Sequence, residues 1–197
     1  MCAVDVRPAI GTDRLILRGV TRADAGAIAE LANDLGVSGN VATMPYPYRP
    51  ADALAFIAGT ERADPRAHAE FAIEHRQFGL VGMLGFHEKE PPAIGSPMAD
   101  SSQESRSLRE RGRAEVGYWL GRPFWNRGYA TEALTAALRW VKFDWRRHVV
   151  WGGHFADNRA SGQVLVKAGF LYTGDVEWRM SEARAEPAPT RMMVWLA

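Results

Sequence analysis

Hydrophobic residues recur at two different spacings along this chain, and each spacing predicts a different element. Alternation or short apolar runs predict strands, as at Leu15-Ile16-Leu17. Steps of three and four residues predict a helix with one buried stripe, and the clearest such stripe lies before Trp145. Its members are Ala130, Ala133, Leu134, Ala137, Leu138, Val141 and Trp145.

The pattern predicts an alternation of strands and helices over most of the chain. The expected strands are 14–18, 71–74, 80–86, 114–120, 148–155, 170–178 and 191–196. The expected helices are 25–35, 50–62, a helix ending near Trp145, and 158–168. Because a helix separates strands 114–120 and 148–155, we expect this pair to be parallel with a right-handed crossover.

Local signals place several of the boundaries. Thr21 is suited to cap a helix, Pro50 to begin one, and Gly169 to follow the end of one. Pro187 and Pro189 predict a polar link between the last two strands, because proline cannot donate a backbone hydrogen bond.

Composition indicates a soluble globular protein of one domain spanning 1–197, with a core of about 12–197. Apolar residues make up 47% of the 197 and charged residues 24%. The net charge of +1 argues against a nucleic-acid partner. Met1 to Gly11 lack the apolar run of a signal peptide, and no apolar stretch is long enough to span a bilayer. With Cys2 as the single cysteine, we expect a cytoplasmic location and no membrane contact.

Residues 88–113 interrupt the pattern with prolines, serines and charges. This composition predicts a flexible insertion, which is either a solvated loop or a loop that covers a substrate or binds a partner.

The turn at 125–133 has the form of an anion site. A strand leads through one glycine, Gly128, directly into the amphipathic helix. The first turn of a helix carries unpaired N–H groups and partial positive charge, which favour a phosphate. Alternatively, Gly128 only relieves crowding in an ordinary loop.

A second segment changes this balance. Asn158-x-x-Ser161, followed by Lys167-Ala168-Gly169-Phe170, resembles the N-x-x-S…K-x-G-F segment of the GNAT acetyltransferases. Leu120 to Ala133 resembles their pyrophosphate motif, Q/R-x-x-G-x-G/A, with Trp125, Gly128 and Ala130 at the defined positions.

The opening strand, 12–18, resembles the family's T-x-R-L-x-L-R, so the likeness covers roughly residues 12–178. It is nearest to the branch that includes the ribosomal-protein N-terminal acetyltransferases. Trp125 departs from the Gln/Arg pattern and Asn126 stands where glycine is frequent. Since backbone donors bind phosphate, these departures bear on affinity more than on family.

The resemblance implies a mixed α/β fold. Its central sheet is mostly antiparallel and flanked by helices, and strands 114–120 and 148–155 splay apart in the middle. It implies acetyl-CoA as cosubstrate and a primary amine as acceptor, which is either a protein N-terminus or a small molecule. The cofactor-binding residues it implies are Tyr118, Trp119, Leu120, Trp125, Asn126, Arg127, Gly128, Tyr129, Ala130, Thr131, Asn158 and Ser161.

Two residues are candidates for catalysis. Glu115, on the strand beside the expected thioester, is the candidate base, acting through water; otherwise it is a surface carboxylate. The resemblance implies that Ser161 donates a hydrogen bond to the departing thiolate; otherwise it is an ordinary first-turn serine. Asn158 either contacts the cofactor or caps its helix, and both roles are compatible.

Other functions have weaker support in the residues. The histidines lack ligand spacing in the sequence, which argues against a metal. Ser161, His154 and Asp157 have the residue types of a hydrolase triad, without its G-x-S-x-G turn. A catalytically silent acyl-CoA sensor, or an interaction module on the same scaffold, is an alternative. The acceptor is expected to depend on loops 36–50, 88–113 and 179–190, and a homodimer is one option for the assembly.

Overall fold

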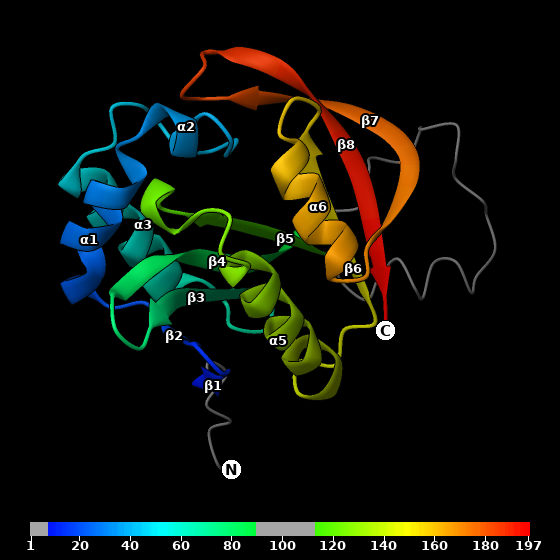
Figure 1. Ribbon diagram of the computed structural model, residues 1–197, viewed down its shortest axis with the longest axis horizontal. Coiled ribbons are helices and arrows are strands. Elements are labelled where there is room, and N and C mark those ends of the chain that lie inside the picture. Colours follow the sequence, from blue (N-terminus) through cyan, green and yellow to red (C-terminus); the bar gives the residue numbers. More distant parts are fainter. Residues whose placement is uncertain (1–7, 90–112) are drawn as a thin grey trace.

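The computed structural model describes residues 8–89 and 113–197, and within them one eight-stranded sheet forms the centre of the molecule (Figure 1). The strand order is β1-β2-β3-β4-β5-β6-β8-β7. Neighbours are antiparallel except β5 and β6, which confirms the expected mixed sheet with one parallel pair. The strands are β1 Ile10–Gly11, β2 Leu15–Gly19, β3 His68–His75, β4 Gly79–Lys89, β5 Arg113–Leu120, β6 Val149–Phe155, β7 Leu171–Ser181 and β8 Glu186–Leu196.

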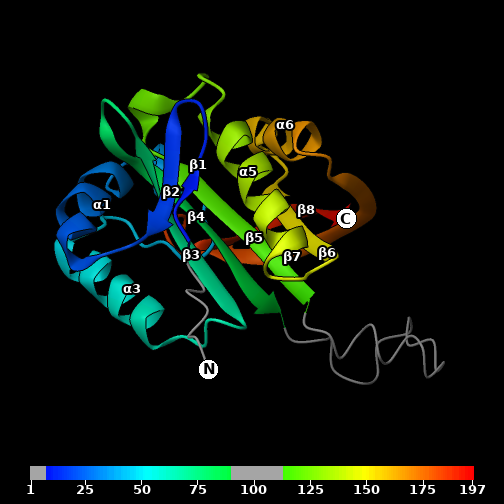
Figure 2. The same ribbon diagram turned by 90° about the horizontal axis from the view of Figure 1, so that it is seen from below.

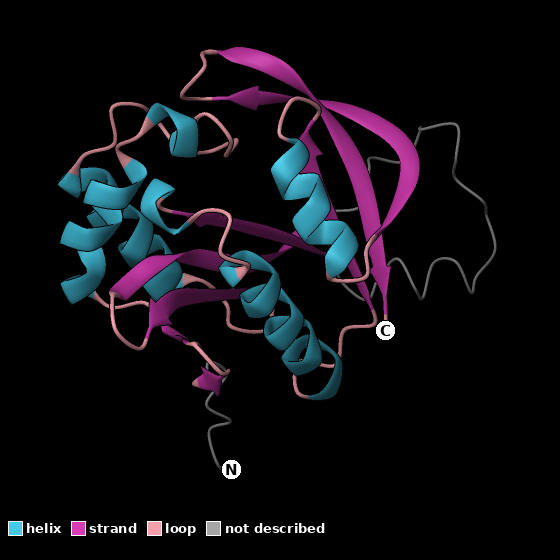
Figure 3. Ribbon diagram, viewed as in Figure 1, coloured by secondary structure: helices cyan, strands magenta, loops and turns pink. Residues whose placement is uncertain are grey.

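Helices cover both faces of the sheet (Figures 2 and 3). α1 (Ala25–Ala32), α2 (Leu35–Ser38) and α3 (Pro50–Arg62) pack together on one face. α5 (Tyr129–Phe143) and α6 (Arg159–Lys167) cover the other. A helix must bury its apolar stripe against another element, and two helical layers around one sheet achieve this for all of them.

The predicted helix starts are confirmed. Thr21 and Asp24 form a capping box at the short 3-10 helix that leads into α1, and Pro50 is the first residue of α3. α1 ends at Ala32 instead of Leu35. The reason is Asp34, whose carboxylate accepts a hydrogen bond from the Gly36 N–H at 2.7 Å and thereby begins α2.

The core lies in two layers because side chains alternate across the sheet. In β4, Leu84 and Phe86 point toward α5 while Met83 points toward α1 and α3. In β5, Val116 joins the α5 layer and Trp119 packs against the α1 and α3 layer, as alternation along a strand requires. Burying one large apolar side chain stabilises the fold by roughly 1.5–3 kcal/mol.

The parallel strands separate after a short paired stretch. β5 and β6 pair at Ala114–Val150, Glu115–Trp151 and Val116–Gly152, where the register ends. Over the remaining described residues of β5 the two strands diverge, as expected. Gly117, the first residue past the paired stretch, has open space where a side chain would project.

The expected link around Pro187 and Pro189 is wrong, because both prolines lie inside β8. The Pro189 carbonyl accepts a hydrogen bond from the N–H of Ala156, just past β6, and therefore points away from β7. Because the nitrogen and the carbonyl of one strand residue face the same side, the N–H that Pro189 lacks would not have been directed at β7. Residues two apart share this orientation, so Pro187 costs the β7–β8 ladder no donor either. The turn between these strands is 182–185 instead.

The predicted insertion is shorter than 88–113, since β4 runs to Lys89 and β5 begins at Arg113. The remainder, 90–112, lies outside the described residues. Among the described helices, none is both long enough and apolar enough to cross a bilayer.

Candidate functional site

The turn before α5 holds two residues in the left-handed backbone region. Gly128, the N-cap, has φ 79° and Asn126 has φ 60°. Asparagine is among the few side chains that tolerate this region, which explains why it can replace a glycine here. The Trp125 indole N–H donates to the Leu120 carbonyl at 2.7 Å and closes the loop from β5. The Gly128 N-cap has no side chain to occupy the donors of the first turn of α5.

Thr12 and Arg14, just before β2, hold this turn through hydrogen bonds. Arg14 donates to the Arg127 carbonyl at 3.0 Å and to Glu132 at 2.7 Å. Glu132 also accepts from the Thr12 hydroxyl at 2.6 Å. Burial opposes ionisation of Glu132, but the contacts with Thr12 and Arg14 outweigh it and lower its pKa.

A cavity of about 470 Å³, which we name the turn cavity, lies beside the turn. Its lining includes every predicted cofactor-binding residue except Arg127: Tyr118, Trp119, Leu120, Trp125, Asn126, Gly128, Tyr129, Ala130, Thr131, Asn158 and Ser161. Arg127 is exposed, and its carbonyl is held by Arg14 outside this lining. The structure thus brings together segments from β5, the turn and α6.

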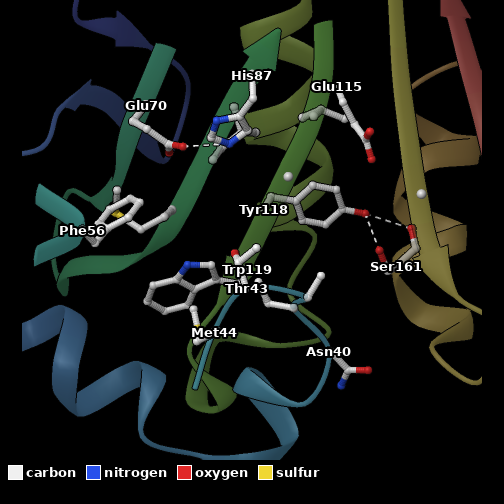
Figure 4. Close-up of a pocket in the computed structure, with 18 of the residues that line it drawn as sticks. Asn40, Thr43, Met44, Phe56, Glu70, His87, Glu115, Tyr118, Trp119 and Ser161 are labelled. Atoms are coloured by element: carbon white, nitrogen blue, oxygen red, sulfur yellow. Dashed lines mark hydrogen bonds and ion pairs between the residues drawn. The ribbon is translucent and has the colours of Figure 1, made fainter. Parts of the chain in front are cut away.

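A second cavity, the sheet cavity, has a volume of about 650 Å³ (Figure 4). It lies over the face of β3, β4 and β5 that carries Glu70, His87 and Glu115, and residues 40–45 of the α2–α3 connection wall it. Met44, Pro45 and Tyr48 of loop 36–50 line it. Both cavities share Tyr118, Trp119 and Ser161 in their linings, so they meet there.

Tyr118 and Ser161 form the junction between the cavities. The Tyr118 hydroxyl donates to the Ser161 carbonyl at 2.9 Å and lies 2.8 Å from the Ser161 hydroxyl. Burial raises the pKa of Tyr118 well above its ordinary value, so the phenol stays protonated. Asn158 caps α6, since its side chain accepts from the Ser161 N–H at 3.1 Å, and it also lines the turn cavity. Two hydroxyls are therefore fixed where the strands diverge.

Glu115 lies in the sheet cavity, but it is not a solitary carboxylate. Both of its oxygens contact the guanidinium of Arg179 from β7. Arg179 also pairs with Glu177 at 2.8 Å. Burial acts against its charge, and the two carboxylates outweigh burial and raise the pKa of Arg179. Glu115 is thus oriented and held by a permanent cation.

Sequence reasoning missed a cluster of His68, Glu70 and His87. His87 Nε2 lies 3.0 Å from Glu70 Oε1, and His68 Nε2 lies 3.3 Å from the same oxygen. The absence of ligand spacing between histidines was misleading, because the β3–β4 register places His68 directly opposite His87. One potential ligand atom from each of the three lies within 4.8 Å of the others, so among the described residues they could hold a metal ion. The register of the β3–β4 hairpin is the information that would have revealed this cluster, because it pairs His68 with His87.

The β7–β8 turn is hydrogen-bonded to loop 36–50, whose residues 40–45 wall the sheet cavity. Arg184 binds Asp157 at 2.7 Å and also donates to the Gly39 carbonyl and the Asn40 side chain. The Glu182 N–H donates to the Ala42 carbonyl at 3.0 Å. One turn thereby joins loop 36–50 to the β6–α6 connection.

The residues of a hydrolase triad do not assemble. His154 Nε2 contacts the Tyr172 hydroxyl at 3.0 Å, while Asp157 pairs with Arg184 and Ser161 with Tyr118. Each member has a different partner, so the triad interpretation is wrong.

Comparisons with known proteins agree on one family. The family model "Acetyltransferase (GNAT) domain" matches residues 14–171. A curated relative, the uncharacterized N-acetyltransferase YoaA of Bacillus subtilis, is 28% identical over 174 residues, which is 85% of each chain. A GNAT-family acetyltransferase structure from Bacillus anthracis superposes with a TM-score of 0.73 at 20% identity, covering 96% of this chain and 98% of that one. The ribosomal L7/L12 alpha-N-protein acetyltransferase RimL in complex with coenzyme A has a TM-score of 0.76 at 16% identity, with 96% and 98% covered.

Proposed function

Because this chain belongs to the GNAT acetyltransferase family, we propose that it transfers the acetyl group of acetyl-CoA directly to a primary amine. The observation that carries the proposal is the junction at Tyr118 and Ser161. There a cavity with an anion-binding turn meets a second cavity lined with acidic groups. A donor with a pyrophosphate and an acceptor with an amine would approach this point from opposite sides.

The turn cavity is the proposed site of acetyl-CoA. The N–H groups of about 126–131 would donate to the pyrophosphate, which the positive end of the α5 dipole would also attract. The pantetheine would extend along β5 toward the place where β5 and β6 separate, near Tyr118, Trp119 and Leu120. RimL bound to coenzyme A has the same fold, which supports this placement.

The reaction would need no enzyme nucleophile. The neutral amine nitrogen attacks the thioester carbonyl carbon, a C–N bond forms, and the C–S bond breaks. The nitrogen loses a proton and the CoA thiolate gains one. Ser161 is the proposed hydrogen-bond donor to the departing sulfur, and the thiolate proton would be supplied through its hydroxyl. Tyr118 positions it, since the Tyr118 hydroxyl donates to the Ser161 carbonyl and lies 2.8 Å from the Ser161 hydroxyl.

The acceptor is proposed to be a primary amine, and a polypeptide N-terminus is the first class to test. An α-amine has a pKa near ~8, against ~10.4 for a lysine side chain, so more of it is neutral at pH 7. The L7/L12 N-terminal acetyltransferase supports a peptide, while the spermidine N-acetyltransferase of Vibrio cholerae, a structure with the same fold, supports a small polyamine.

Thiol release from acetyl-CoA tests the proposal. The free thiol is measured in the presence of short peptides with free or blocked N-termini, of polyamines, and of no amine. We expect release that depends on an unblocked amine. If acetyl-CoA binds by calorimetry but no amine accelerates release, a silent acyl-CoA sensor is the correct interpretation. If no CoA species binds, both fail.

Substitution of Gly128 tests the pyrophosphate site. Gly128→Asp adds a negative charge at the N-terminus of α5, and Gly128→Asn adds nearly the same shape without charge; both side chains tolerate positive φ. Two unit charges ~4 Å apart repel by about 1 kcal/mol in water and about 4 kcal/mol near a protein surface. We therefore expect the Asp variant to bind CoA about tenfold more weakly than the Asn variant, measured by calorimetry. Equal affinity of the two would refute this site.

A further inference from the structure

We propose that the sheet cavity takes its acceptor as a cationic primary amine and that His87, paired with Glu70, removes the proton from it. The proposal rests on the acetyltransferase function proposed above. It assigns the proton acceptor to a cluster on β3 and β4 instead of to Glu115.

The charge of the cavity favours a cation. The described residues that line it include four carboxylates but only one guanidinium. The carboxylates belong to Asp52, Glu70, Glu88 and Glu115, and the guanidinium belongs to Arg179. Burial and the charge of Asp52 raise the pKa of Tyr48, also in the lining, to about 12. An ammonium ion is therefore attracted, but it cannot attack a thioester until it loses a proton.

Three groups in the cavity could take this proton, namely Glu70, His87 and Glu115, and His87 is the most accessible of them. The Glu70 side chain is only 5% exposed, whereas that of His87 is 47% exposed. The carboxylate of Glu115 is held by Arg179 through both oxygens. An acceptor can reach His87, while Glu70 is accessible only to its histidine neighbours.

The Glu70 carboxylate orients the imidazole. With Nε2–H donating to Glu70 Oε1 at 3.0 Å, the lone pair of the neutral ring is on Nδ1. Burial favours the neutral ring, but the hydrogen bond with Glu70 and the charges of Glu70 and Glu115 outweigh it and raise the pKa of His87. For Glu70, burial is in turn outweighed by both histidines, and its pKa is lowered. The pair therefore holds a proton on the imidazole more strongly than an ordinary histidine does.

Two glycines lie between this pair and the junction. Glu70 lies opposite Gly85 on β4, and Gly85 lies opposite Gly117 on β5. A Cβ on Gly85 would overlap the Glu70 carboxylate, and a Cβ on Gly117 would meet open space. Because antiparallel partners share a face, the Glu70 carboxylate covers Gly85, and the surface over Gly117, beside the divergence of β5 and β6, is open. An amine can lie there between His87 and the thioester.

The proton balance is complete. His87 Nδ1 takes one proton from R–NH₃⁺ and becomes imidazolium. The neutral amine attacks the acetyl carbon, the C–S bond breaks, and a second nitrogen proton reaches the CoA thiolate. The imidazolium then releases its proton to solvent, which leaves the amide, CoA–SH and the resting enzyme.

The groups that face His87 are on several elements, so its titration must be compared between variants. They are His68 and Glu70 on β3, Glu115 on β5 with its partner Arg179 of β7, and the neighbouring Glu88, which lies 3.9 Å from Arg147. Asp52 on α3 lines the same cavity. The alkaline limb, where the acceptor ammonium loses its proton in solution, is the same in every variant, so a difference in the acid limb reports on the enzyme.

The test compares His87→Gln and Glu70→Gln with Glu115→Gln and with His148→Gln, an exposed histidine outside both cavities. We expect kcat to fall about 100-fold or more in His87→Gln, with the affinity for CoA unchanged and the His148 control active. In Glu70→Gln the acid limb of kcat/KM should move to lower pH, because the imidazolium loses its carboxylate partner. If Glu115→Gln loses the acid limb and His87→Gln keeps it, Glu115 is the base and the proposal is wrong.

A measurement on the resting protein separates this proposal from the proposed function. NMR titration of the His87 ring should give a lower midpoint in Glu70→Gln than in the wild type, whether or not any amine is acetylated. An unchanged midpoint overturns the pairing even when thiol release is normal. A stoichiometric divalent metal in the purified protein that is lost in His87→Gln would make His87 a ligand, and this also overturns the proposal. Absent thiol release with a normal midpoint shift instead counts against the acetyltransferase function.

Discussion

At the scale of single residues, Gly85 leaves room for the Glu70 carboxylate on the face of the sheet, because it has no side chain. The Glu70 carboxylate occupies the space above this residue, beside His87. A glycine here is needed for a close approach between a side chain and a backbone, and its φ is not unusual. The same position would thus control both packing and the proposed proton transfer.

Gly85→Ala should separate these two effects. The added methyl group displaces the Glu70 carboxylate, so we expect kcat to fall and the free energy of unfolding to fall by about 1–3 kcal/mol, as for other overpacked sites. Steady-state kinetics and urea unfolding measure the two. Gly19→Ala in β2 is the matched control, since its new methyl meets nothing within 4 Å.

The combination with His87→Gln gives a sharper result. If Gly85→Ala acts through the Glu70–His87 pair, the two changes share one cause, and the double variant should be little slower than His87→Gln. Strictly multiplicative effects on kcat would mean that Gly85 acts elsewhere.

At the scale of elements, local signals predicted the helices better than the site. α3 begins at Pro50 and α6 is capped by Asn158 as expected, because a cap depends on residues within one turn. The cluster of His68, Glu70 and His87 depends on the register of β3 and β4, which no local spacing reveals. The prolines of β8 were misjudged for a related reason, since the side of the strand that pairs is a tertiary property.

The turn between β7 and β8 is the element that should tune the acceptor. Arg184 joins Asp157 to the loop at Gly39 and Asn40, and Asn40 lines the sheet cavity. The Asp157 side chain is 63% exposed, so water screens this ion pair and it is worth about 1 kcal/mol, which corresponds to a change of a few-fold in binding. Arg184→Met should therefore raise KM for the amine a few-fold and leave CoA affinity and unfolding nearly unchanged.

The control for this prediction is Arg139→Met, on the exposed side of α5 and outside both linings. Kinetics at saturating acetyl-CoA isolates KM for the amine. An equal effect of both substitutions would indicate a general loss of positive charge, and a change in kcat alone would mean that the turn affects chemistry instead of acceptor binding.

At the scale of the whole molecule, ion pairs make the free energy of unfolding depend on pH. The paired carboxylates lose their contribution at low pH, and His87 loses its contribution at high pH. Burial raises the pKa of Asp24, Glu70 and Glu132, but their hydrogen-bonded partners outweigh burial, so each is lowered from its ordinary value of 3.8 or 4.5. Their contribution to stability is complete above those values and is lost as the pH falls through the lowered pKa. The pKa of His87 is raised from 6.5, so its contribution is complete below 6.5 and is lost as the pH rises through the raised value.

The urea midpoint should therefore be highest between about pH 5 and 6.5 and should decline on both sides. Glu132→Gln should reduce the acid decline, because its ties to Thr12 and Arg14 no longer depend on ionisation. Glu30→Gln, on the exposed side of α1, should leave that decline as in the wild type. His87→Gln should flatten the alkaline side. It should also remove part of the Glu70 share of the acid decline, because His87 helps to lower the pKa of Glu70, while Asp24 and Glu132 keep their shares. If the alkaline side stayed as steep as in the wild type, His87 would not be the group whose charge the fold supports, and the proton-acceptor proposal would lose its electrostatic basis.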